Sequence, residues 1–563
     1  MERLLVVSEA EADLKCDQIL HLKKTDPALL LARLQTSFLN TSQVNMMAFQ
    51  PASLPMIWAA LSFFVLYRVG IIFYRLFFHP LAKFPGPKYL AASGLPHIYY
   101  NNVKGEWYRQ VKDLHDKYGD MVRIAPNTLA VDGSVGWEDV FGHKIGDREE
   151  FGKDPAFYRP VDDSNGATDM LDANRTDHRR QRRLVSHAFS DSALLEQESL
   201  IKSYIDLLML RLKALSTEGE FLDIVKWYNF TTFDIIADLT FGDPFHCLEN
   251  SKMHPWIAMI FNSIKFASMM RIFNFYPILK PLLPLLITED ARQNRAEHVE
   301  LVSSKTHARI ALGNDTPKKD FMSFILRHND SEKGMSHAEL LGTADLLIIA
   351  GSETTATLLS GLTYHLARNP ESWDRLKTEV RGTFSSEDEI TMRSTNTLPY
   401  LHACLEEGLR IHPPAVETPP RFSPGGTIDG KYVAKGTRII IHQWATHHQA
   451  RNFAKPDEFI PERWLAKSHP LFSEEFVNDN RASMQPFSHG PRNCLGKNLA
   501  YAEMRMIMAR LAWNFELEVA PQSIAWVQGQ KVYLTFEKPS LLMKLHLKDE
   551  KNIVEDCENE AAI

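Results

Sequence analysis

The residue with the clearest chemical potential is Cys494, which lies in a glycine-bearing loop. The loop reads Phe487-Ser-His-Gly-Pro-Arg-Asn-Cys-Leu-Gly496, and the amphipathic pattern of residues 497–510 predicts a helix directly after it. A thiolate just ahead of a helix N-terminus is stabilised by the helix dipole and by free backbone N–H groups, so Cys494 could act as a metal ligand. The simpler interpretation is an ordinary buried cysteine in a turn, which is the commoner fate of a single cysteine.

The residues around Cys494 fit a buried flat ligand better than a simple turn. Gly490 and Gly496 would let the backbone approach such a ligand closely, because glycine has no side chain to intervene. Arg492 offers a planar fork of donors to a carboxylate, and Phe487 can cover the sulfur and keep water away from it. Together these positions indicate a thiolate site for a planar cofactor.

A second chemical signal is an acid and an alcohol in the middle of an expected long helix. Residues 336–339 have the Ser-x-x-Glu pattern of a capping box, and the helical pattern continues to Asn369. The centre reads Ala350-Gly-Ser-Glu-Thr-Thr355, where glycine costs a helix about 1 kcal/mol relative to alanine. A functional reason would be a groove for dioxygen, with the Thr354 hydroxyl and the Glu353 carboxylate supplying protons. The alternative is a helix-packing notch with a threonine bonded back to its own helix.

Two further stretches carry charged residues at helical spacing. The segment 174–190 is rich in arginine, which is also typical of a solvated face or a nuclear-localisation patch. His178 and Arg182 nevertheless lie four residues apart and share one face of an expected helix. Glu407 and Arg410 lie three apart on another helix face, a pair that alone would contribute only about 0.2–0.5 kcal/mol.

The Cys494 loop has phenylalanine, glycine, arginine, cysteine and glycine at offsets 0, 3, 5, 7 and 9. This pattern resembles the haem-binding signature of the cytochrome P-450 family without a departure, and the resemblance extends over residues 80–545. It implies a mainly α-helical fold with small β-sheets, preceded by one N-terminal transmembrane helix. It also implies haem b (iron protoporphyrin IX) with the Cys494 thiolate as axial ligand. The loop residues implied to contact the haem are Phe487, Gly490, Arg492 and Gly496.

The same resemblance assigns roles to the other chemical residues. It implies that Thr354 hydrogen-bonds the bound oxygen and that Glu353 helps to relay protons. His178, Arg182 and Arg421 match positions that contact the haem propionates, although many members carry tryptophan where this chain has His178. These three residues are therefore expected to bind the cofactor and not to react.

Two groups of charged residues are implied to act outside the chemistry. In the family, the Glu407–Arg410 pair is joined by an arginine of a later segment, here Arg463, and this network locks the core behind the haem. An acidic electron-donor flavoprotein would dock on the thiolate side, where opposite charges favour association. The arginines suited to that docking are Arg179, Arg180 and Arg183.

An apolar stretch near the N-terminus predicts a single transmembrane helix. Residues 54–74 are apolar except for Arg68, and about 20 residues at about 1.5 Å each span a bilayer core. The stretch lies too far from the start for a signal peptide and lacks a small-residue cleavage site. A buried core helix is the remaining alternative. Basic residues follow the span and do not precede it, so we expect an endoplasmic reticulum anchor with the catalytic domain in the cytoplasm.

The chain divides into five expected segments. They are a mixed-charge lumenal extension or gene-model artefact (1–45), the anchor (46–75), a Pro/Gly hinge (76–90), the haem-thiolate catalytic domain (91–547) and a polar tail (548–563). Met46 would make an alternative start, directly ahead of the anchor. Asn40 lies in an N-glycosylation sequon on the proposed lumenal side, so the chain is a possible glycoprotein.

The composition fits a globular body that handles small molecules. Of 563 residues, 63 are Lys or Arg and 70 are Asp or Glu, and the net charge of −7 gives no reason to expect nucleic acid as a partner. The five cysteines are scattered and odd in number, which argues against a disulfide scaffold. No Gly-x-Gly-x-x-Gly motif follows an expected strand, so NADPH would act through a separate NADPH–cytochrome reductase.

The implied activity is that of a monooxygenase, which inserts one oxygen atom from dioxygen into a lipophilic small molecule by hydroxylation, epoxidation or multi-step oxidation. Residues 78–87 and 232–242 look like membrane-bound fungal members, which commonly act on polyketides, terpenoids or alkaloids in secondary-metabolite pathways. The alternatives are a reductase-independent haem-thiolate isomerase or peroxide-rearranging enzyme, and a non-enzymatic haem sensor. Substrate selectivity is expected in segments 160–172, 255–286 and 415–418, and near Ala350.

Overall fold

The chain divides into two units, Met1–Ile72 and Phe73–Ile563, and each is described by itself. The computed structural model describes residues 53–144, 146, 148–158, 169–283, 287–313, 318–329 and 333–548. Several predictions fall outside those residues. They concern the 1–45 extension, the Asn40 sequon, most of the 160–172 selectivity segment and the tail after residue 548.

The apolar N-terminal stretch forms a long helix, α3 (Ser53–Phe77), which extends three residues beyond the expected span. Most of its side chains are exposed, as a helix made to meet lipid would require. One other described helix, His337–Arg368, is long and apolar enough to cross a membrane, but most of it is buried within the protein. The candidate membrane span is therefore α3. Residues 78–87 of the predicted hinge are non-helical, and α4 (Lys88–Ala92) begins inside its C-terminal end.

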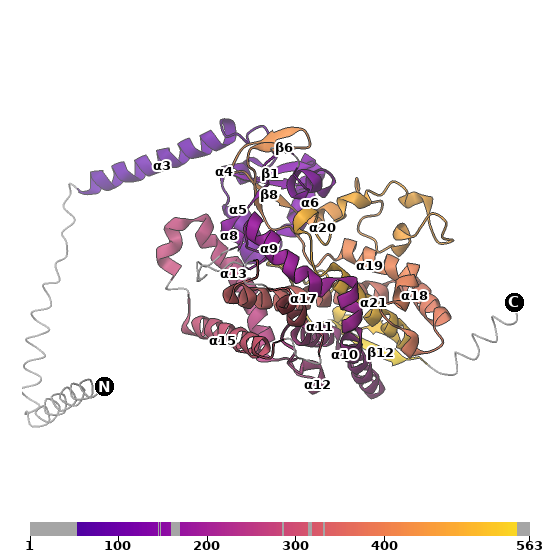
Figure 1. Ribbon diagram of the computed structural model, residues 1–563. Coiled ribbons are helices and arrows are strands. Elements are labelled where there is room, and N and C mark those ends of the chain that lie inside the picture. The colour runs from indigo at the N-terminus through magenta and orange to yellow at the C-terminus, as the bar shows by residue number, and fades with distance from the viewer. Residues whose placement is uncertain are drawn as a thin grey trace, which may run out of the picture. The chain divides into compact units, whose positions relative to one another are not determined.

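The second unit is mainly helical, as predicted (Figure 1). Its further helices are α5 (Leu95–Ile98), α6 (Trp107–Tyr118), α7 (Gly133–Gly136), α8 (Pro155–Tyr158), α9 (Arg175–Val185), α10 (Asp191–Glu218), α11 (Ile224–Phe241), α12 (Cys247–Asn250), α13 (Pro255–Phe275), α15 (Glu289–Ala311), α16 (Phe321–Arg327), α17 (His337–Arg368), α18 (Pro370–Thr383), α19 (Pro399–Ile411), α20 (Gln443–His447) and α21 (Lys497–Asn514). Its strands are β1 (Met121–Ala125), β2 (Thr128–Val131), β3 (Gly152–Lys153), β4 (Leu222–Asp223), β5 (Arg421–Phe422), β6 (Gly426–Ile428), β7 (Lys431–Val433), β8 (Arg438–Ile441), β9 (Phe515–Val519), β10 (Lys531–Val532), β11 (Phe536–Glu537) and β12 (Leu542–Leu547).

The strands form small sheets, and the largest of them matters for the site. Its order is β1-β2-β8-β5-β3, in which β2 and β8 are parallel and the other neighbours are antiparallel. The remaining described strands pair as β4-β12-β9, β6-β7 and β10-β11. At the edge of the large sheet, Lys153 of β3 lies directly opposite Arg421 of β5. Like charges in that position are destabilising unless something between them compensates.

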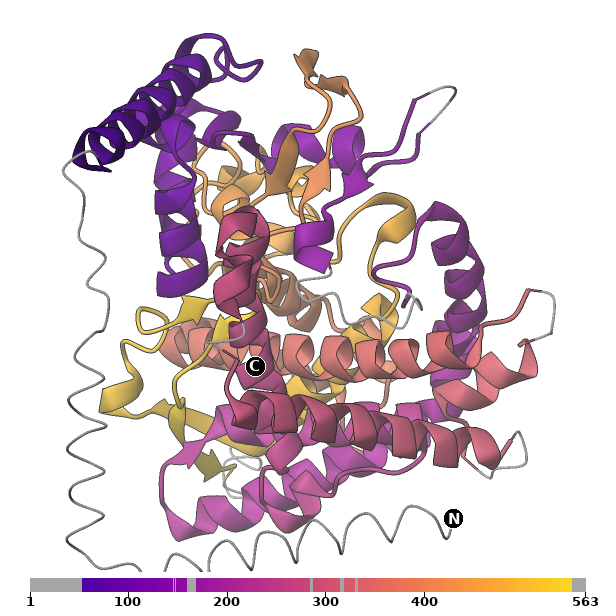
Figure 2. The same ribbon diagram turned by 90° about the vertical axis from the view of Figure 1, so that its left-hand side faces the viewer.

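The long helix α17 positions the predicted acid and alcohol. Both halves of the predicted capping box are present, because the Ser336 hydroxyl accepts from the Glu339 N–H and the Glu339 carboxylate accepts from the Ser336 N–H. Figure 2 shows α17 running as one continuous helix through the body. Residues 355–364 are buried on every side. Ahead of them, partly exposed residues recur at helical spacing along one face: Gly342, Asp345, Leu346, Ile349, Ala350, Gly351 and Thr354. From Gly342 to Thr354, one face of α17 is therefore left partly exposed by the rest of the chain.

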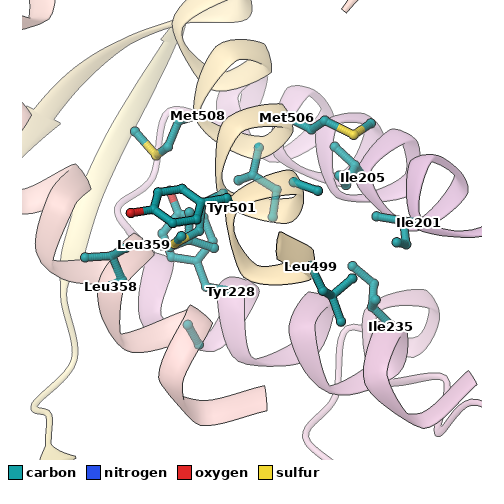
Figure 3. Packing of buried hydrophobic residues seen from close by; sticks show 14 of the residues in the cluster. Ile201, Ile205, Tyr228, Ile235, Leu358, Leu359, Leu499, Tyr501, Met506 and Met508 are labelled. Carbon is teal, nitrogen blue, oxygen red and sulfur yellow. The ribbon is translucent and has the colours of Figure 1, made fainter. Parts of the chain in front are cut away.

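An apolar core beneath α17 holds that helix in place (Figure 3). The side chains labelled there come from α10, α11, α17 and α21, and burial of each stabilises the fold by about 1.5–3 kcal/mol. They are Ile201, Ile205, Tyr228, Ile235, Leu358, Leu359, Leu499, Tyr501, Met506 and Met508. The Tyr228 hydroxyl and the Thr363 hydroxyl share a hydrogen bond of 2.7 Å inside this core.

The predicted network of Glu407, Arg410 and Arg463 is present and fully buried. Arg410 binds Glu407 through two parallel hydrogen bonds of 2.8 and 2.7 Å, and the Arg463 Nε donates to the same carboxylate over 3.2 Å. The Trp464 indole N–H adds a fourth bond of 2.8 Å. Burial by itself would raise the pKa of Glu407, but the two guanidinium groups lower it below its ordinary value. The network joins α19 to the segment around Arg463, so its role is structural, as expected.

Candidate active site

The Cys494 loop is shaped by its own backbone and by a distant turn. The Cys494 N–H donates to the Phe487 carbonyl over 2.7 Å, and Gly496 is the N-cap of α21. Gly490 has φ +74°, and a Cβ there would lie 2.0 Å from the carbonyl oxygen of Phe141. The close approach of the protein's own backbone is thus a reason for glycine at Gly490 that the sequence did not indicate. Around Gly496 an added Cβ would meet nothing closer than 3.8 Å, so space remains there.

The Cys494 thiol is accessible, and opposing effects act on its pKa. Its side chain is exposed, yet enough protein surrounds it for burial to raise the pKa of the thiol, against the Gly496 N–H and the charges of Arg182 and Lys497. A bound metal cation deprotonates such a thiol outright. Among the described residues, no group of three or more His, Cys, Asp or Glu side chains could hold a metal ion.

Basic side chains from separate elements converge beside this loop. His178 and Arg182 come from α9, Arg421 from β5 and Arg492 from the loop itself, and Lys153 of β3 joins them. Burial and then the charges of Arg492, Lys153, Arg182 and Arg421 lower the pKa of His178 to about 3. Burial followed by Arg492 and Arg421 lowers the pKa of Lys153 to about 7. The mutual depression shows that positive charge is in excess here.

Hydrogen bonds fix some of these cations against backbone oxygens. Arg182 donates to the main-chain and side-chain oxygens of Asn493, both over 2.6 Å, and so ties α9 to the Cys494 loop. Arg492 donates to the Ala173 carbonyl over 3.2 Å, and its Nε lies 3.3 Å from the carboxylate of Glu150. Backbone carbonyls orient guanidinium groups without neutralising them, whereas the Glu150 carboxylate forms an ion pair with Arg492. The contacts with Asn493 consequently leave the charge of Arg182 in place.

Arg421 is the least compensated of the group. Its side chain is buried, and its Nε has no hydrogen-bond partner within the described chain. The guanidinium lies 5.3 Å from the ring centre of Phe141 and 6.0 Å from that of Tyr158, and burial lowers its pKa. A buried, unsatisfied charged donor costs several kcal/mol unless an anion meets it. This is the environment that an anionic ligand group would complete.

Two hollows border the cluster. One, of about 380 Å³, is lined by α9 residues including His178 and Arg182, and the other, of about 440 Å³, by Lys153, Tyr158 and Arg421. Both also touch Arg492. Haem carries two propionate carboxylates on one edge of a flat ring. The orphaned Arg421 donor, the excess of cations and the accessible thiol all fit that group.

The acid and alcohol on α17 have contacts that the sequence did not foresee. The Thr354 hydroxyl donates to the Ala350 carbonyl over 2.7 Å, which is the back-bonded geometry of the alternative interpretation. A Cβ on Gly351 would lie 2.6 Å from a side-chain carbon of Ile236, so this glycine is also a packing notch against α11. Ala350 is exposed, however, so the rest of the chain does not cover α17 at this position. Glu353 is buried and forms an ion pair with Lys538.

The structure thus gathers the predicted residues into two groups. The loop residues, His178, Arg182 and Arg421 surround the Cys494 side, and Glu353 and Thr354 lie on α17, which packs against α21 behind that loop. The Phe487 ring packs on Tyr501, with ring centres 5.2 Å apart. Sequence reasoning missed three residues that touch these groups and that only strand pairing or tertiary packing brings to the site: Lys153, Tyr158 and Lys538. Asn493 belongs to the Cys494 loop itself, but its contact with Arg182 was not predicted.

A mainly helical body with an accessible cysteine loop, a cation-rich pocket and a grooved central helix defines a haem-thiolate protein. The chain belongs to the cytochrome P-450 family, whose pattern residues 85–544 match. Members use haem b with a cysteine thiolate as axial ligand, and a reductase typically supplies their electrons. The protein is accordingly an oxidoreductase of the monooxygenase class.

Named relatives agree with this class. The chain is 42% identical to the cytochrome P-450 monooxygenase astJ of Aspergillus oryzae over 84% of this chain and 93% of that one. It is 44% identical to the monooxygenase astA of Talaromyces wortmannii over 85% of this chain and 95% of that one. A trichothecene C-4 hydroxylase of Trichoderma arundinaceum is 39% identical over 84% of this chain and 94% of its own length.

Proposed function

We propose that Cys494 is the axial ligand in this chain and that Arg421, Arg182, His178 and Arg492 hold the haem propionates. The observation that carries the assignment is the buried Arg421 Nε, which has no partner among the described residues and lies near other basic side chains. Bound haem supplies the redox chemistry, because a thiolate ligand donates electron density that favours cleavage of the O–O bond. Lys153, opposite Arg421 in the sheet, would join the same carboxylates.

The loop around Cys494 would keep the sulfur in place and tune it. The Gly496 N–H and the Arg182 and Lys497 charges lower the pKa of the thiol, against the larger effect of burial, which raises it. The Phe487 carbonyl accepts from the Cys494 N–H, and the Phe487 ring packs on Tyr501, so both contacts hold this end of the loop in place. Gly490 and Gly496 shape the loop.

On the opposite side of the cofactor, α17 would orient oxygen and deliver protons. Thr354 holds its hydroxyl hydrogen toward Ala350, which leaves its oxygen lone pairs directed to accept a bond from the groove side. Glu353 precedes it on the helix and carries one buried carboxylate oxygen without a hydrogen-bond partner among the described residues. These two groups can move a proton from the interior to the groove. Product formation without loss of peroxide depends on that delivery.

The substrate is proposed to be a lipophilic small molecule of fungal secondary metabolism. Support comes from the trichothecene hydroxylase among the relatives and from the exposure of Ala350 on α17. The segment 415–418 is proposed to contribute to selectivity as well. In α13, by contrast, Trp256 packs against Phe233 and donates to His298, so the start of the predicted 255–286 lining serves the core.

Electron supply is proposed to come from an NADPH–cytochrome reductase docking near α9. Arg179 and Arg183 are exposed and suit an acidic partner. Arg180 does not, which corrects the prediction: its guanidinium binds Glu339 over 2.5 Å and Asp177 over 3.1 Å. Arg180 therefore holds α9 against the start of α17.

The membrane assignment is likewise a proposal beyond the apolar helix itself. α3 would anchor the chain in the endoplasmic reticulum membrane as a single span, with the body in the cytoplasm, because Arg75 and later basic residues follow it. Charge reversal of Arg75 together with Lys83 should weaken that orientation.

Isotopically labelled dioxygen tests the proposed activity. Membranes holding the chain and a reductase are supplied with NADPH and a panel of terpenoid and polyketide substrates. A monooxygenase places one labelled oxygen atom in the product, and the reaction stops without NADPH. A product that forms without NADPH and carries no label would identify an isomerase instead. Haem uptake with no product and no NADPH consumption would identify a sensor.

A further inference from the structure

A buried lysine contacts the acid of α17. The Lys538 ammonium forms an ion pair with Glu353 Oε1, and both side chains are almost fully buried. Thr357, one turn further along α17, donates to the same oxygen over 3.1 Å and accepts from Lys538 over 2.6 Å. The other carboxylate oxygen, Oε2, is buried and has no partner within the described chain. One oxygen of Glu353 is thus tethered and the other is free.

The pair lies at a cavity of about 270 Å³. Glu353 and Lys538 form part of its wall, together with side chains of α11, α13 and the segment 533–540. Lys265 and Glu537, also in the wall, form an ion pair of 2.6 Å and are about half exposed. The cavity therefore extends from a solvent-exposed ion pair to the buried one. Its size and the charged groups at both of its ends suit several water molecules.

We propose that Lys538 is a positioning residue for proton delivery, which holds Glu353 at the inner end of this cavity. The proposal rests on the proposed function of Glu353 and Thr354. A buried ion pair of this kind is weak ground for stability alone, because desolvation offsets much of the attraction. The use of Lys538 is instead to fix the position of the Glu353 carboxylate, which transfers protons next to a cavity that water can enter.

The residues would act in a balanced cycle. Water in the cavity gives a proton to the free Oε2 of Glu353, which passes one on toward the Thr354 hydroxyl and the groove. Each proton that leaves is replaced from solvent, and the ion pair with Lys538 is restored. The electrons come from the reductase. Throughout, Lys538 and Thr357 keep Oε1 fixed, so that Oε2 stays directed along the route.

The test uses the haem-loaded full chain with reductase and NADPH, without added substrate. Oxygen is then reduced either to hydrogen peroxide or, when protons arrive in time, to water. A misplacement of about 1 Å at a reacting group costs about a hundredfold. We expect Lys538→Met to slow water formation by about tenfold to a hundredfold and to change its solvent isotope effect in heavy water. Lys538→Arg should restore most of the loss, and Lys226→Met, an exposed lysine of the same cavity, should match wild type.

A second readout is independent of turnover. Lys538→Met and Glu353→Gln should each lower the apparent melting temperature, and the double variant should lose clearly less than the sum, because the two residues act as a pair. If Lys538→Met lacks haem, Thr357→Val is the variant to use. It removes the uncharged hydrogen bond to Glu353 Oε1 and should likewise raise the share of oxygen that is released as peroxide.

Two outcomes would overturn the inference and can be told apart. In the first, Lys538→Met, or Thr357→Val where that variant is used, divides oxygen between peroxide and water as wild type does and has the wild-type isotope effect, while Glu353→Gln still raises the peroxide share. Lys538 would then only pack against Glu353 and would not position it. An unchanged peroxide share in both Glu353→Gln and Thr354→Ala would instead remove the proposed proton route itself.

Discussion

Removing the charge of Arg421 should stabilise the haem-free protein but weaken the binding of haem. Its guanidinium is buried, its Nε has no partner in the described chain, and Lys153 lies opposite it across the sheet. Replacement by Met keeps a side chain of similar length over the ring of Phe141 and removes the charge. In the absence of haem this relieves an unsatisfied cation. In its presence it removes a donor to a carboxylate.

The magnitudes follow from the burial. An unsatisfied buried polar group costs about 1–3 kcal/mol, so Arg421→Met should stabilise the haem-free protein by about that amount. A hydrogen bond to a charged group contributes about 1.5–3 kcal/mol, so the variant should hold haem about 10- to 150-fold less tightly.

Two assays measure these two opposite effects. Urea unfolding of the haem-free protein gives the change in stability, and transfer of haem to excess apomyoglobin gives the change in haem retention. Arg175→Met removes an exposed arginine at the same hollows and should change neither. If Arg421→Met weakened the haem-free protein as well, the uncompensated-cation argument would be refuted, because Arg421 would then have a protein partner that matters.

Three further changes test other parts of the account. Arg410→Met should destabilise the protein by about 3–5 kcal/mol in urea unfolding, because it leaves a fully buried carboxylate on Glu407 with one partner fewer, and a loss below about 1 kcal/mol would contradict the network's role. Lys153 has a pKa of about 7 in the folded haem-free protein against about 10.4 when unfolded, so its contribution to stability is complete above about pH 10 and is lost as pH falls through about 7. Urea midpoints between pH 7 and 9.5 should rise more steeply in wild type than in Lys153→Met, and parallel curves would contradict the shift. Gly490→Ala should cut haem content far more than Gly496→Ala, measured as haem per protein, because only the former Cβ would strike a backbone carbonyl; equal losses would count against the loop geometry.

Local patterns in the sequence were enough to predict the parts of the fold that depend on neighbouring residues. The capping box at Ser336 and Glu339 placed the start of α17, because both partners lie within one helical turn. The Glu407–Arg410 pair gained its third member, Arg463, through family resemblance, and the structure confirms that network. The mainly helical fold and the family were predicted in the same way, from the loop that contains Cys494.

Contacts between distant residues could not be read from spacing. Lys153 reaches Arg421 only because β3 pairs with β5, and each strand has two residues and no periodic signal. Lys538 comes from a segment that follows a short hairpin and meets Glu353 through packing alone. Arg180 is a case in which a local pattern predicted the wrong role. An arginine in a basic run suggested an exposed docking surface, while tertiary structure paired it with Glu339.

The central claim is that the thiolate of Cys494 binds the haem iron, and a reduced carbon-monoxide difference spectrum tests it most directly. Membranes holding wild type should give a strongly red-shifted Soret band, which is the mark of a thiolate ligand, and Cys494→Ala should lose that band. Cys404→Ala, which removes a buried thiol elsewhere in the core, should keep it. A red-shifted band that persists in Cys494→Ala, or a wild-type band at the position of histidine-ligated haem, would contradict the account.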